Sequence, residues 1–222
     1  MFEKKISAGL PFLIVGLSYL LFKLNKNLYF NIFGHESHYR NALGEHFQFI
    51  FYFLSFIFCC LTLHGVKKLP YPATSRLLIT LFAALALFIA MEEISWGQWY
   101  LNWSTPQFWQ NINYQNETTF HNLDIIQKKN ASGTNFLRLS FLFTGLFGAL
   151  GWTVRNRYAF RKMYTILPPV YISTYFLIPA GFYMLVILSF VPWYHQELFE
   201  TILSMGFLLV AVNNFLRSKS LP

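Results

Sequence analysis

Six long apolar runs limit what this chain can fold into more than any other feature of its sequence. They cover residues 6–24, 47–63, 77–100, 136–154, 170–193 and 198–216. A helix of roughly 20 apolar residues crosses the hydrocarbon core of a bilayer, which is about 30 Å thick. Only 12% of the 222 residues are charged, compared with roughly 25% in an ordinary soluble domain. We therefore predict an all-α protein: a polytopic transmembrane bundle of about six spans, with one domain over residues 1–222.

The distribution of Lys and Arg predicts how these spans are oriented. With six spans, the N-terminus, the second and fourth loops and the C-terminus share one side and hold 11 of the 17 cations. Cytoplasmic loops carry the excess of Lys and Arg, so both termini are expected in the cytoplasm. The cations lie in short clusters between apolar runs, so the net charge of +8 indicates topology and not a nucleic-acid partner. The expected surroundings are a lipid bilayer, with the chain as a multi-pass protein of the cell membrane.

The third apolar run contains two adjacent carboxylates, Glu92 and Glu93. If its helix continues to residue 100, both lie about 12 Å below the helix end, at 1.5 Å of rise per residue. A carboxylate at that depth costs several kcal/mol unless it is paired, protonated or in contact with water. We expect these two side chains to face the bundle interior or a wet cavity. The alternative is that one of them pairs with Arg138 and only locks two helices together.

The same topology brings further acids and histidines to the outer leaflet. Glu117 and His121 are four residues apart, which places them on one face if the segment is helical. A carboxylate and an imidazole so placed form half of a metal site or a general acid/base pair, although in a polar loop they are more often a surface hydrogen bond. The predicted catalytic residues are Glu92, Glu93, Glu117 and His121. The predicted ligands of a divalent metal, if one binds, are Glu93, Glu117 and His121. The predicted supporting residues are Glu45, Ser95, Gln98, Asn122, Arg138, His195, Glu197 and Glu200.

Short motifs in this region resemble those of a known group of proteins. The segments EEISWGQ at 92–98, NYQNE at 113–117 and HNL at 121–123 resemble a group of uncharacterised bacterial polytopic membrane proteins. That group has E-E-I-S-W-G-Q-R followed by N-x-Q-x-E-x-x-x-H-N-L. This chain has Trp99 where the pattern has arginine, so an ion pair of that arginine with the glutamates is absent here or is replaced by Arg138. The resemblance implies a bacterial inner membrane and a set of key positions, but no particular chemistry.

Three functions remain open from the sequence. The first is an enzyme that acts on a lipid or lipid-linked substrate by acid/base or metal-assisted chemistry. The second is a proton- or ion-coupled transporter in which the buried glutamates titrate, although the inner halves of the spans offer few polar residues. The third is an accessory or assembly subunit of a larger membrane complex. In that case other membrane subunits are its partners, and the glutamates only hold helices together.

Overall fold

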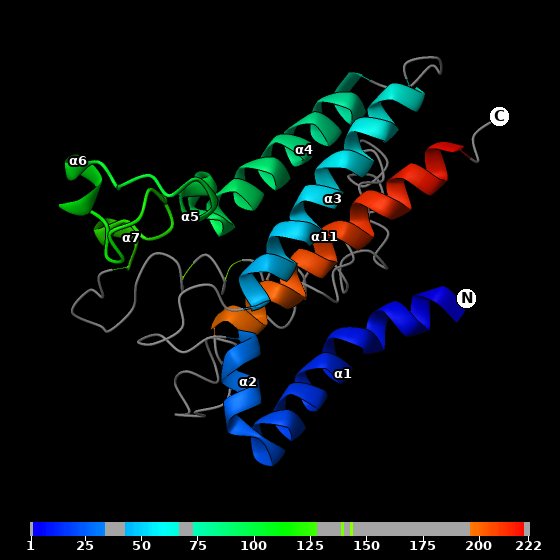
Figure 1. Ribbon diagram of the computed structural model, residues 1–222. Coiled ribbons are helices and arrows are strands. Elements are labelled where there is room, and N and C mark those ends of the chain that lie inside the picture. Colours follow the sequence, from blue (N-terminus) through cyan, green and yellow to red (C-terminus); the bar gives the residue numbers. More distant parts are fainter. Residues whose placement is uncertain are drawn as a thin grey trace.

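The computed structural model (Figure 1) describes residues 2–33, 43–66, 73–127 and 196–219, together with Leu139 and Phe143. Within these residues every regular element is helical, apart from one isolated bridge between Asn113 and Leu123. The predicted all-α class is therefore confirmed for this part of the chain. The predicted span 170–193 lies outside the described residues, and so does 136–154 except for Leu139 and Phe143.

The long helices of the described chain coincide with predicted apolar runs. They are α1 (Phe2–Leu24), α3 (Leu43–Val66), α4 (Ala73–Glu93) and α11 (Gln196–Lys219). A helix satisfies its backbone hydrogen bonds internally, which is why long apolar segments adopt it in lipid. Within the described ranges, two segments are long and apolar enough to cross a membrane, Leu43–Gly65 and Glu197–Leu216. The six-span topology and the location of the termini stay predictions.

The central helix α3 packs against both α4 and α11 (Figure 1). It runs parallel to α11, since their contacts follow one another along both helices: Gln48 with Glu197, Tyr52 with Phe207, and Phe58 with Phe215. Helix α4 runs in the opposite direction (Figure 1). The beginnings of α3 and α11 therefore lie at the same end of the bundle as the end of α4.

The two faces of α3 have the polarity of a helix surrounded by lipid. The buried face carries Gln48, Tyr52, Ser55, Cys59 and Thr62. The hydroxyls of Ser55 and Thr62 donate to the carbonyl oxygens of Phe51 and Phe58, at 2.6 and 2.8 Å. The exposed face is made of large apolar side chains: Phe47, Ile50, Phe53, Ile57 and Leu61. An amphipathic helix in water shows the opposite pattern.

Helix α4 repeats this arrangement with small residues in place of polar ones. Its buried face contains Ala83, Ala86 and Ala90. Glu93 follows Ala90 by three positions and so lies on the same face of the helix. Small side chains allow helices to approach closely, which is how lipid-embedded helices gain packing energy. The outward face carries Leu77, Leu81, Leu85 and Phe88. The packing of α4 thus turns Glu93 toward the neighbouring helices.

A short helix, α2 (Lys26–Phe33), closes the end of the bundle where α3 and α11 begin. Asn25 starts it, because its Oδ1 accepts the backbone N–H of Leu28 at 3.0 Å, a typical N-terminal cap. The side chains of α2 share an apolar cluster with α1 and α11, made of Phe22, Tyr29, Phe33, Leu198, Phe199 and Ile202. Gly44 lies so close to α2 that a Cβ atom there would be 3.0 Å from the carbonyl oxygen of Ile32.

Helix α4 ends at Glu93, whereas the sequence predicted a helix that continues to residue 100. The next residues have positive φ angles, 48° at Ser95, 57° at Trp96 and 84° at Gly97, and left-handed residues cannot continue a right-handed helix. The chain passes instead through η1 (Ser95–Gly97) into α5 (Gln98–Leu101). Glu92 and Glu93 therefore lie at the helix end, and the expectation that they lie deep below it was wrong.

Candidate active site at the end of α4

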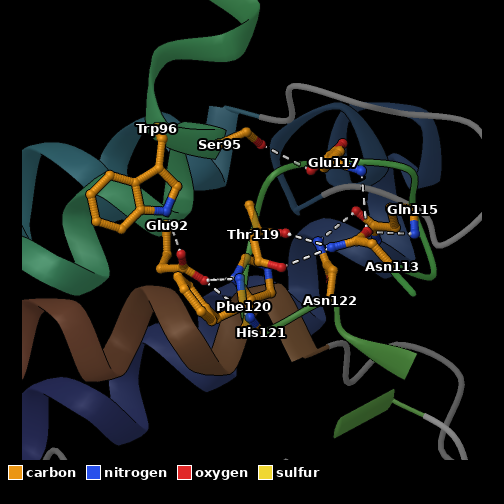
Figure 2. Close-up of polar contacts among 10 residues, drawn as sticks. All are labelled: Glu92, Ser95, Trp96, Asn113, Gln115, Glu117, Thr119, Phe120, His121 and Asn122. Carbon is orange, nitrogen blue, oxygen red and sulfur yellow. Dashed lines mark hydrogen bonds and ion pairs between the residues drawn. The ribbon is translucent and has the colours of Figure 1, made fainter. Parts of the chain in front are cut away.

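A compact loop, residues 94–127, follows α4 and holds five of the twelve predicted site residues: Ser95, Gln98, Glu117, His121 and Asn122 (Figures 1 and 2). It contains α6 (Gln107–Gln110) and α7 (Asp124–Gln127). Two strand-like backbone bonds close it: the N–H of Tyr114 donates to the carbonyl of Asn122, and that of Asp124 to Ile112, both at 2.8 Å. The loop is thereby folded back toward the last turn of α4.

Glu92 joins this loop to α4. The Glu92 side chain is 4% exposed, and its carboxylate accepts from three N–H groups and contacts the His121 ring (Figure 2). The Trp96 indole donates to Oε1 at 2.5 Å, while the backbone N–H groups of Phe120 and His121 donate to Oε2 at 2.6 and 3.0 Å. The fourth contact joins Oε2 to His121 Nδ1 at 3.2 Å. N–H donors on a carboxylate stabilise its ionised form, so Glu92 is a buried anion with matched partners.

His121 is oriented by this carboxylate. With Nδ1 next to a carboxylate, the neutral ring favours the tautomer that carries its proton on Nδ1 and makes Nε2 the acceptor nitrogen. The side chain is 37% exposed, so solvent or a ligand can reach the ring. A buried carboxylate behind a reachable imidazole is the arrangement that general acid/base catalysis uses. The structure therefore brings together Glu92 and His121, which the sequence had placed in one site.

Glu117 and His121 do not lie on one helical face, because the segment between them is a series of turns. Glu117 is buried and accepts the Ser95 hydroxyl at 2.9 Å on Oε2, while its backbone N–H donates to Asn113 Oδ1 at 3.1 Å. Ser95 is held in its left-handed conformation by this contact. Glu117 thus supports the turn that ends α4. The carboxylate that contacts His121 is that of Glu92 and not, as predicted, that of Glu117.

The remaining loop residues form the frame of the site. Gln98 donates to Thr105 Oγ1 at 2.6 Å and accepts from the backbone of Thr118 at 3.1 Å. Asn122 donates to Gln115 Oε1 at 3.0 Å. Asn113 was not among the predicted site residues, although its buried amide donates to the Thr119 carbonyl at 2.8 Å. Its place as the first residue of the N-x-Q-x-E motif was the signal that pointed to it.

Glu93 belongs to a different set of residues. Its carboxyl group lies within electrostatic range of the carboxyl groups of Glu200, Glu197, Glu45 and Glu92. The predicted supporting residues Glu45, on α3, and Glu197 and Glu200, on α11, are thus electrostatic neighbours of Glu93, and Glu197 is also within electrostatic range of His121. Arg138 and His195 lie outside the described residues.

The predicted metal ligands Glu93, Glu117 and His121 are not brought together. Each has a separate environment, as described above, and among the residues that the structure describes no three His, Cys, Asp or Glu side chains form a metal-binding group. Among the predicted catalytic residues, Glu92 and His121 are the two whose side chains the structure places in direct contact. Comparison of the chain with known protein families, with curated proteins and with solved structures finds no match.

Proposed function

We propose that this chain is a multi-pass protein of a bacterial inner membrane, with six spans and both termini in the cytoplasm. The apolar outward faces of α3 and α4 and their polar or small buried faces support this proposal. The excess of Lys and Arg on the side of the termini supports the orientation. In this arrangement loop 94–127 lies at the outer face of the membrane.

In this setting we propose that the chain is an enzyme whose acid/base group is His121, oriented by Glu92. The single observation that carries this proposal is the 3.2 Å contact between Nδ1 of a partly exposed imidazole and a buried carboxylate. Through Nε2 the ring would take a proton from a water or hydroxyl group as it attacks the substrate. It would then return that proton to the leaving group.

The surroundings of His121 support a lipid or lipid-linked substrate. The loop exposes large apolar side chains: Tyr100, Leu101, Trp103, Phe108 and Phe120. Phe120 adjoins the pair, since its backbone N–H donates to Glu92. Aromatic residues of this kind sit at the boundary between lipid and water. A substrate whose tail stays in the bilayer could present its polar head to His121.

The test uses the full chain in liposomes made from a bacterial total-lipid extract that contains lipid-linked sugars. Lipids are compared by mass spectrometry before and after incubation. Wild-type protein should convert one lipid class, and His121→Ala should lower the rate by roughly 10²- to 10⁴-fold, the usual contribution of general acid/base catalysis. His46→Ala is the matched control, because His46 contacts Tyr100 through Nδ1 and lies outside the pair. Equal conversion by wild type and His121→Ala, or none by folded wild type, would refute the proposal.

A second candidate is an accessory subunit of a membrane complex. The observation that favours it is the hydrogen-bonded environment of Glu92, which suits a purely structural joint between α4 and the loop. For such a subunit His121→Ala should have no effect on the complex. Glu92→Gln should instead lower the amount of partner recovered by cross-linking in membranes.

A further inference from the structure

The outward face of α4 continues onto the loop through aromatic rings. That face carries Leu77, Leu81, Leu85 and Phe88, which are exposed and spaced so that they form one stripe along the helix. At the end of the stripe the Phe88 ring contacts that of Phe120 in the loop, with 5.8 Å between the ring centroids. The exposed apolar surface of α4 therefore does not stop where the helix ends.

Within the loop the series of ring contacts goes on. The Phe120 ring meets that of Trp109 at 5.1 Å, and Trp109 meets Phe108 at 6.3 Å, both edge to face. Phe88 also contacts Trp96 edge to face, at 5.8 Å. Edge-to-face pairs at such distances are a favourable arrangement of aromatic rings. We call these five residues the aromatic ridge, and three of them, Phe88, Phe108 and Phe120, are exposed.

The aromatic ridge includes two of the residues that hold Glu92. The Trp96 indole donates to Glu92 Oε1 at 2.5 Å, and the backbone N–H of Phe120 donates to Oε2 at 2.6 Å (Figure 2). His121 follows Phe120 in the chain and contacts the same carboxylate at 3.2 Å. The surroundings of the ridge therefore determine the level at which the His121 ring lies.

The charge of the loop limits what the ridge can contact. Residues 94–127 include Glu117 and Asp124 but no Lys or Arg, and Glu117 is buried. A juxtamembrane Lys or Arg contributes about 1 kcal/mol to the attraction of anionic lipids, and this loop has none to offer. Tryptophan and tyrosine instead prefer the head-group level of a bilayer for their amphipathic rings. The loop therefore suits an apolar contact whose strength does not depend on charge.

We propose that the aromatic ridge inserts among the head groups and upper acyl chains of the outer leaflet and holds the Glu92 and His121 pair at head-group level. This proposal rests on the multi-pass arrangement proposed above. Lipid is the occupant because the ridge continues the stripe of α4 that faces lipid in that arrangement. The bonds that His121 reaches are then those of a lipid head group and its linkage, and not those in the middle of an acyl chain.

Spin labels on two equally exposed loop residues test the insertion. Phe108 is 69% exposed and Tyr114 is 71% exposed, but Tyr114 takes no part in the ridge. Phe108→Cys and Tyr114→Cys are each labelled in the full chain, in a background without native cysteines, and placed in liposomes. The ratio of relaxation by oxygen to relaxation by a water-soluble nickel complex should be roughly threefold or more higher at Phe108, since apolar groups in the interface lie about 5–10 Å into the boundary of head groups and acyl chains.

A second measurement separates apolar insertion from attraction by charge. The ratio at Phe108 should be the same in liposomes of neutral lipid and in liposomes with anionic lipid. It should also be the same at low and at high salt, because screening weakens only contacts between charges. Folding of each labelled chain is checked by circular dichroism, and Phe120→Cys replaces Phe108→Cys if the latter does not fold.

Three outcomes would overturn the proposal: equal ratios at Phe108 and Tyr114, a nickel-accessible label at both Phe108 and Phe120, or a Phe108 ratio that falls at high salt. The second would leave a protein partner as the occupant of the ridge. A label on Cys60, in a Cys59→Ala background, identifies which proposal fails. If that label lies in the hydrocarbon while the Phe108 label lies in water, the multi-pass arrangement stands and the insertion alone is wrong. His121→Ala should abolish lipid conversion and leave the Phe108 ratio unchanged, because its imidazole is not part of the ridge.

Discussion

The carboxylates of Glu92 and Glu93 leave the last turn of α4 toward different partners, although the two residues are adjacent in sequence. Glu92 accepts N–H groups of Trp96, Phe120 and His121. Glu93 faces the acids of α3 and α11. Successive side chains on a helix point about 100° apart, so one turn of α4 faces two different environments. Substitutions of these neighbours should therefore have opposite effects.

Glu92→Gln should lower the free energy of unfolding by about 2–3 kcal/mol, because an amide group would face N–H donors that now bind a charged carboxylate. Glu93→Gln should be neutral or stabilising, since an amide replaces a carboxyl group whose electrostatic neighbours are other carboxyl groups. Thermal unfolding of both variants in one detergent measures the difference. A similar loss of stability in the two variants would contradict the separation of their environments.

His121→Ala should cost only about 1 kcal/mol of stability. Glu92 keeps its three N–H donors in this variant, since the backbone N–H of residue 121 remains. Near-ultraviolet circular dichroism and the unfolding midpoint measure the effect. A loss of stability as large as that of Glu92→Gln would mean that the imidazole is mainly structural, which would favour an accessory subunit over an enzyme.

The Ser95 hydroxyl and the Glu117 carboxylate should be energetically coupled. Their 2.9 Å hydrogen bond is buried and joins the strained turn to the loop, so Ser95→Ala should cost about 1–3 kcal/mol. A double-mutant cycle of Ser95→Ala and Glu117→Gln should give an interaction energy of about 0.5–3 kcal/mol. Additive effects of the two substitutions would show that the turn is held by other contacts.

The sequence predicted the described long helices well, because length and hydropathy decide where a helix forms in lipid. It could not predict the end of α4. Ser95 and Trp96 have no local preference for positive φ. The carboxylate that accepts the Ser95 hydroxyl belongs to Glu117, which reaches the turn only through the folded loop.

The sequence predicted which residues belong to the candidate site, but it did not predict which of them contact one another. The spacing of Glu117 and His121 indicated a helical face that does not exist, and the pairing of His121 with Glu92 depends on how the loop turns. Gln48 gave no signal, since a single glutamine in an apolar run has no visible partner before α11 is placed beside α3.

Gly97→Ala should destabilise the protein by about 1–2 kcal/mol. Gly97 has a φ of 84°, a left-handed conformation that costs about this much for a residue with a Cβ atom. Space is not the reason, since the nearest atom to an added Cβ, Leu101 Cδ1, would be 3.6 Å away. Gly16→Ala is the matched control: it lies within α1 with nothing within 4 Å and should be neutral or stabilising by up to about 1 kcal/mol. Equal effects at the two glycines would argue against the turn at the end of α4.

Two adjacent cysteines on α3 allow a direct test of which face meets lipid. Cys59 is buried beside Ile79, Ala83 and Ala211, whereas Cys60 is exposed. In liposomes a nitroxide on Cys60, in a Cys59→Ala background, should be relaxed by oxygen and hardly by a water-soluble nickel complex, because oxygen concentrates in the hydrocarbon. A label on Tyr114→Cys, in a background without native cysteines, should show the reverse, since Tyr114 is exposed on the loop. Strong relaxation of the Cys60 label by nickel would place the outward face of α3 in water. That result would contradict a lipid-facing α3 and the multi-pass arrangement proposed for the chain.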